Sequence, residues 1–235
     1  MRSIDPINNE LHWRLYEWGR LELLNEVESG FPLLCRIKNP AAACAHNLLS
    51  NARLSEREWM VSAFAKSFWA PFLASWGESV SEEELEFRRE FSNSLMDYPA
   101  PNIDRDSSLV RRALRSECVN LMGKIFPNKS EKWGGGVSVW RAWYEDMEIL
   151  TFLDFGGRTR DFSCSHGIHF EGQTIGPRIS ALSWMCITSS NDWKYIREDE
   201  IDTTIEVLGV CLERFTNAAP KLLRGLSTEN PSSHK

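Results

Sequence analysis

The apolar residues change their spacing near residue 137, and this change constrains the fold more than any other feature of the chain. Before that point they recur every three or four residues, as in helices. After it come four runs rich in β-branched and aromatic residues, separated by short breaks that contain glycine, proline or acidic residues, which is typical of strands. The predicted strands are residues 137–144, 148–155, 160–170 and 179–188.

Short connections favour antiparallel neighbours, so we expect a four-strand meander. After the strands, Ile201, Leu208 and Phe215 share one stripe of a final helix, as expected of a helix packed on a sheet. The chain is therefore predicted to be α+β: a helical N-terminal half, then a helix, an antiparallel four-strand meander and a C-terminal helix packed on the sheet.

Residues 98–107 are rich in proline and turn residues, and they are the predicted boundary between two regions. We expect a helical region over 1–98, an α+β domain over 107–226 and a disordered tail over 227–235. A single domain is the alternative for a chain of 235 residues.

Two Ser-x-x-Glu sequences predict the starts of helices in the first half. In each, the serine oxygen would accept from an unpaired amide, and the glutamate would reach back to the serine backbone. The pairs are Ser55 with Glu58 and Ser81 with Glu84. The first of these helices is expected to stop or kink near Pro71.

Charge and composition narrow the classes of function. The net charge of -6 disfavours nucleic-acid binding and suits a basic protein partner. No apolar run is long enough to cross a membrane, and the N-terminus does not have the pattern of a signal peptide. The six cysteines form no Cys-x-x-Cys pair, which indicates reduced thiols and a cytoplasmic protein. We expect no cofactor.

The ten tryptophans are the unusual feature of the composition, since tryptophan is enriched in binding hot spots. Trp140 and Trp143 would point to opposite faces of one strand, so one of them is expected to be exposed beside acidic residues. The predicted protein-binding residues are Trp140, Trp143, Tyr144, Glu145, Asp146 and Asp154.

A hydrolase is the first alternative, and it would use the segment 161–171. Strand alternation separates this segment into two sets of side chains. One set pairs Cys164 with His166 as candidate catalytic residues, and the other offers Asp161, His169 and Glu171 as candidate metal ligands. The segment matches no established spacing such as His-Glu-x-x-His.

A nucleic-acid-binding regulator is the second alternative, based on the most basic stretch of the chain. The residues concerned are Arg105, Arg111, Arg112, Arg115, Lys124, Lys129 and Lys132. A solvated helix face explains most of them without a ligand.

The leading interpretation is therefore a non-enzymatic protein-binding protein, such as an inhibitor or an immunity-type partner of a bacterial toxin. The predicted layout of residues 107–226, a helix, a meander and a helix, resembles that of some bacterial immunity proteins, without a shared motif.

Overall fold

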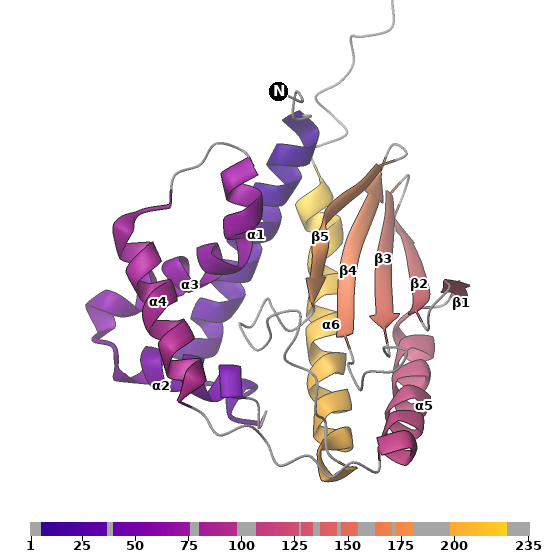
Figure 1. The fold of residues 1–235 in the computed structure, drawn as a ribbon. Helices are drawn as coiled ribbons and strands as arrows, with labels where there is room; N and C mark the ends of the chain where they lie inside the picture. Colours follow the sequence, from indigo (N-terminus) through magenta and orange to yellow (C-terminus); the bar gives the residue numbers. More distant parts are fainter. Residues whose placement is uncertain are drawn as a thin grey trace, which may run out of the picture.

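The computed structural model describes ten segments of the chain, which are residues 6–36, 40–75, 80–97, 107–126, 128–133, 137–144, 147–154, 163–170, 173–180 and 198–224. Their helices are α1 (Pro6–Glu28), α2 (Pro40–Asn51), α3 (Leu54–Ser75), α4 (Glu82–Met96), α5 (Ser107–Ile125) and α6 (Ile201–Leu223), with 3₁₀ turns at η1 (Leu34–Arg36) and η4 (Glu198–Glu200). Their strands are β1 (Asn128–Trp133), β2 (Val137–Tyr144), β3 (Met147–Asp154), β4 (Ser163–Phe170) and β5 (Gln173–Ser180). Helices α1 to α4 gather on one side of the molecule and the strands on the other, with α6 between them in the view of Figure 1.

The prediction of a four-strand meander is wrong. The described strands form a five-stranded antiparallel sheet in the order β1-β2-β3-β4-β5. Strand β1 was missed because its sequence, NKSEKW, has no apolar alternation.

The fifth strand is the second part of the correction. Gly176 and Pro177 were expected to lie in the connection between the predicted strands 160–170 and 179–188, yet both lie inside β5. Among the described strands β5 pairs only with β4, and their register shifts between His166 and Ile168. An outer, irregular strand tolerates a proline because its missing N–H breaks no central ladder bond. The predicted strand 179–188 lies outside the described residues after Ser180.

Helix α1 ends in a Schellman motif. Gly30 and Phe31 both have positive φ, 81° and 61°, and the Phe31 amide donates to the Glu26 carbonyl oxygen at 2.8 Å. The buried Glu26 carboxylate then accepts from the amides of Leu33 at 2.6 Å and Leu34 at 2.9 Å. This single carboxylate pairs with the first amide of η1 and with the amide just before it, and so fixes the direction in which the chain leaves α1.

The two predicted capping boxes have different outcomes. The box at the start of α4 is confirmed, because the Glu84 amide donates to the Ser81 hydroxyl and the Ser81 amide donates to the Glu84 carboxylate. The prediction of a capping box formed by Ser55 and Glu58 is wrong. Helix α3 begins two residues earlier than that box requires, and it continues past Pro71 to Ser75.

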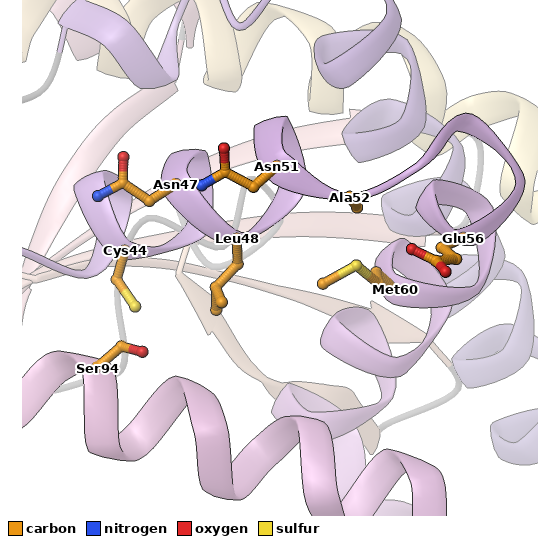
Figure 2. A pocket seen from close by; sticks show the side chains of 8 residues that line it. All are labelled: Cys44, Asn47, Leu48, Asn51, Ala52, Glu56, Met60 and Ser94. Carbon is orange, nitrogen blue, oxygen red and sulfur yellow. The ribbon is translucent and has the colours of Figure 1, made fainter.

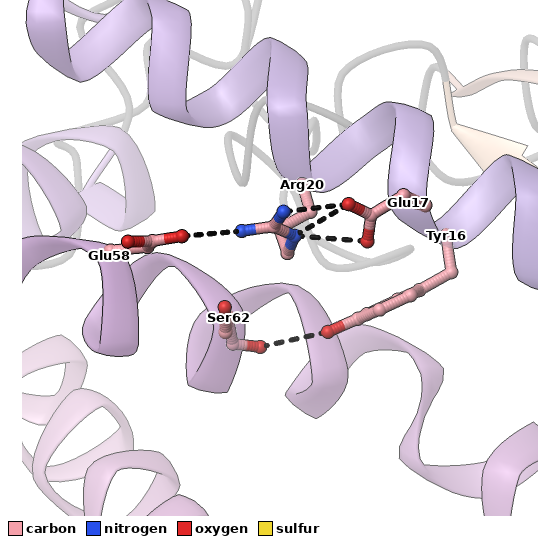
Figure 3. A network of polar contacts seen from close by, with 5 residues as sticks. All are labelled: Tyr16, Glu17, Arg20, Glu58 and Ser62. Carbon is pink, nitrogen blue, oxygen red and sulfur yellow. Dashed lines mark hydrogen bonds and ion pairs between the residues drawn. The ribbon is translucent and has the colours of Figure 1, made fainter.

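At the start of α3 it is Glu56 that reaches back, and its carboxylate accepts from the Arg53 amide at 3.2 Å. Glu58 instead faces α1, where Arg20 lies between Glu17 and Glu58, as Figure 3 shows. In the same contact the buried Tyr16 hydroxyl donates to the Ser62 carbonyl oxygen at 3.5 Å.

Helices α1 and α6 pack on one another. The rings of Trp18 and Phe215 meet edge to face with centroids 5.7 Å apart. Arg14 donates to the carbonyl oxygens of Leu222 at 3.1 Å and Arg224 at 2.6 Å, so α1 supplies donors to carbonyl groups at the C-terminal end of α6. An ion pair between Glu22 and Arg214 adds to this contact, and Arg36 of η1 forms a second ion pair with Glu206 of α6.

One core cluster includes buried side chains from α1 to α6 and from the sheet. On the sheet it contains Trp140 and Ile149, and on α6 it contains the predicted stripe residues Ile201, Leu208 and Phe215. The division into regions 1–98 and 107–226 stays a prediction, and residues 98–106 of the predicted boundary lie outside the described residues. Among the described helices, none is both long enough and apolar enough to cross a membrane.

We predict that substitution by alanine changes the free energy of unfolding in opposite directions at Gly30 and Gly123. A Cβ at either position meets no atom within 4 Å, so only the backbone differs. Gly30→Ala should lower the free energy of unfolding by about 1 kcal/mol, because φ is positive there. Gly123→Ala, inside α5, should raise it by about 0.5–1 kcal/mol. Urea unfolding of both variants tests this, and shifts in the same direction would contradict it.

We also predict a loss of stability at alkaline pH that depends on Tyr16. Burial raises the pKa of Tyr16 from 10.0 to about 12, so the folded state binds this proton more tightly than the unfolded state. This difference in pKa contributes about 1–3 kcal/mol to the free energy of unfolding below pH 10, and the contribution is lost as the pH rises towards 12. The buried thiols of Cys118 and Cys211 also have a raised pKa, about 12, and act in the same direction.

Urea unfolding across that pH range should therefore show a shallower decline for Tyr16→Phe than for the wild type. Identical slopes for the two proteins would contradict the role given to Tyr16.

Candidate binding surface around Trp143

The two tryptophans of β2 differ sharply in exposure. The side chain of Trp140 is 7% exposed and belongs to the core cluster, whereas Trp143 is 60% exposed. This confirms that the two residues face opposite sides and that one of them is exposed. Trp140 is thereby removed from the predicted binding surface, because it is not available to a partner.

Cross-strand pairing places three polar residues in one row with Trp143. Trp143 lies opposite Glu148 on β3, Glu148 lies opposite His169 on β4, and His169 lies opposite Thr174 on β5. Directly opposed residues point to the same face of a sheet. The row therefore runs across four strands and starts from the exposed indole.

An ion pair joins a member of this row, Glu148, to Arg141. Arg141 Nη1 donates to Glu148 Oε1 at 2.8 Å, and the two side chains are 28% and 4% exposed. Removing one partner of a pair this buried leaves an uncompensated charge and costs about 3–5 kcal/mol. The pair joins β2 to β3 diagonally and holds the strands on which Trp143 and His169 are placed. We call Arg141, Trp143 and His169, together with the buried Glu148 that supports them, the Trp143 surface.

The sheet on this side is not polar throughout. Val139 and Leu150, on the same face as Arg141, are buried and form a small second cluster. Both faces of β2 and β3 therefore carry buried side chains, and among the side chains described on these two strands Trp143 is the exposed one. The last pair between β1 and β2 is Asn128 with Arg141, so β1 does not extend as far as Trp143.

The other predicted binding residues are less well defined. Tyr144 ends β2 and Asp154 ends β3, but their side chains are outside the described set. Asp154 lies opposite Val137, at the other end of the hairpin from Trp143, so these two residues do not come together. Glu145 and Asp146 join β2 to β3 in sequence and lie outside the described residues.

The candidate hydrolase residues are only partly described. Cys164 lies opposite Leu153, and His166 lies opposite Thr151 in the row of buried Trp140, while the side chains of both are outside the described set. His169 is half-buried, and its partner in register is Glu148.

The predicted metal ligands Asp161 and Glu171 lie outside the described residues. Within the described ranges, no group of three or more His, Cys, Asp or Glu side chains converges as a metal ion would need.

The basic stretch of the second alternative is only partly described. Arg112, Arg115 and Lys124 are exposed on α5. Lys129 and Lys132 belong to β1, with side chains outside the described set. Arg105 and the Arg111 side chain are outside it as well.

The sequence did not identify Arg141 and Glu148 as part of the surface. Arg141 lies three residues before the end of β2, and Glu148 lies four residues after it. In a hairpin this spacing places two residues diagonally across the strand pair, so it could have predicted the ion pair.

Comparisons with protein-family models, with curated proteins and with solved structures found no match to the chain.

Proposed function

We propose that this chain is a non-enzymatic protein-binding protein, of the inhibitor or immunity type, which binds its partner through the Trp143 surface. The observation that supports the proposal is an indole 60% exposed on a strand whose neighbours are fixed by a buried ion pair. Large exposed aromatic side chains on rigid elements are the usual anchors of protein interfaces, because they bury much area and lose little conformational freedom.

The chemistry of the partner follows from charge. The chain carries a net charge of -6, and Glu145 and Asp146 follow β2 directly in the sequence. A basic partner would be attracted over long range, and its lysine or arginine side chains could stack on the Trp143 indole. An inhibitor acts by occupying a surface, so it needs no catalytic group of its own.

The proposed compartment is the cytoplasm. Among the described cysteines, Cys44, Cys118 and Cys211 are buried free thiols and Cys35 is an exposed one. Burial raises the pKa of the three buried thiols, which keeps them neutral and unreactive. Free thiols of this kind are typical of proteins that work in a reducing compartment.

We predict that Trp143→Ala abolishes most of the binding and leaves the fold intact. Truncating a hot-spot tryptophan costs about 2 kcal/mol or more, which is roughly a thirtyfold loss of affinity. The free energy of unfolding should change by no more than about 0.5 kcal/mol, since the side chain is exposed. Tagged wild type and variant are used to capture partners from a lysate of the cells that make the protein.

Leu109→Ala is the matched control, because Leu109 is an apolar side chain 65% exposed on α5. Wild type and Leu109→Ala should retain one stoichiometric protein at moderate salt, and Trp143→Ala should lose it. The proposal fails if Trp143→Ala retains that protein equally well, or if the wild type captures none.

A further inference from the structure

A pocket of about 320 Å³ lies between α2, α3 and α4, among the helices rather than at the sheet. This volume is at the lower end of the range for small-molecule sites. Figure 2 shows the eight residues that line it, which are Cys44, Asn47, Leu48, Asn51, Ala52, Glu56, Met60 and Ser94.

The middle of the pocket is apolar. Leu48 on α2 and Met60 on α3 face one another across it, and Cys44 points from α2 towards α4 (Figure 2). Burial raises the pKa of the Cys44 thiol, and its Sγ lies 3.8 Å from the Phe91 carbonyl oxygen, to which it donates. The thiol is therefore a neutral part of the wall, and this wall suits a short hydrocarbon chain.

The polar groups at the edge include several hydrogen-bond acceptors. The Ser94 hydroxyl donates to the Glu90 carbonyl oxygen at 2.8 Å and also interacts with the Cys44 thiol. Glu56 contributes a carboxylate, and only its Oε2 accepts the Arg53 amide. The side-chain amides of Asn47 and Asn51 each include an oxygen that can accept.

The charged group among the eight lining residues is Glu56, and none of the eight is basic. The adjacent Arg57 donates to the carbonyl oxygens of Ser50 at 3.5 Å and Ala52 at 3.3 Å, so its charge compensates the C-terminal end of α2. The carboxylate of Glu56 is therefore the charge that the lining offers to a ligand.

We propose that this pocket binds a small organic cation, a primary ammonium on a short alkyl chain. The alkyl chain would lie between Leu48 and Met60, and the ammonium would donate to the carboxylate oxygens of Glu56, at the other end of the pocket from Ser94. An ammonium has three donors and no acceptor, which complements these acceptors. A carboxylate of the same length would be repelled by Glu56, and an alcohol would lack the charge.

The test uses the whole protein and three probes with the same alkyl chain: hexylammonium, hexanol and hexanoate. Each is titrated while the methionine methyl resonances are followed by NMR, and the Met60 signal is assigned with Met60→Leu. We expect hexylammonium to shift the Met60 signal saturably, hexanol to bind at least tenfold more weakly and hexanoate to cause no saturable shift.

Two variants locate the binding. Glu56→Gln keeps an oxygen for the Arg53 amide but removes the charge, and it should weaken hexylammonium binding about tenfold, which corresponds to ~1.4 kcal/mol. Ala52→Leu should fill the pocket and abolish binding. Glu213→Gln, an exposed glutamate on α6, is the matched control and should change nothing. The proposal is overturned if hexylammonium does not saturate, if hexanoate binds equally well, or if the two pocket variants bind as tightly as the control.

Discussion

The packing of α1 against α6 is the contact on which the rest of the structure depends, because it joins the two ends of the chain. The Trp18 and Phe215 rings pack edge to face, and Arg14 supplies donors to the last carbonyls of α6. Helix α1 also contacts α3 and β5, and α6 contacts α5. The helices of the first half and the sheet of the second half therefore share one core, although residues far apart in sequence build it.

That core divides the molecule into two chemically different parts. On the sheet, the Arg141–Glu148 pair holds β2 to β3 and leaves Trp143 exposed at the end of its strand. Among the helices, α2, α3 and α4 enclose a small pocket with an apolar middle and hydrogen-bond acceptors at its edge. The first part suits a protein surface and the second a small cation, so each proposal can fail without the other.

The periodicity of the apolar residues predicted those helices and strands that bury one regular stripe of side chains. The stripe of α6 and the opposite faces of Trp140 and Trp143 followed from it directly. It could not predict β1, whose polar residues carry no alternation, or β5, which contains Gly176 and Pro177. Nor could it place Glu148 opposite His169, because strand register depends on pairing between segments about twenty residues apart.

The central claim is that α1 and α6 hold both halves in one cooperative core, and native-state hydrogen exchange of wild type and Phe215→Ala tests it most directly. If the claim is right, the truncation lowers the protection of the slowest amides in α3 and in β3 by similar amounts, about 3–5 kcal/mol in free energy. If only the amides of α5, α6 and the sheet lose protection while those of α3 and α4 keep theirs, the halves are independent and the claim is wrong.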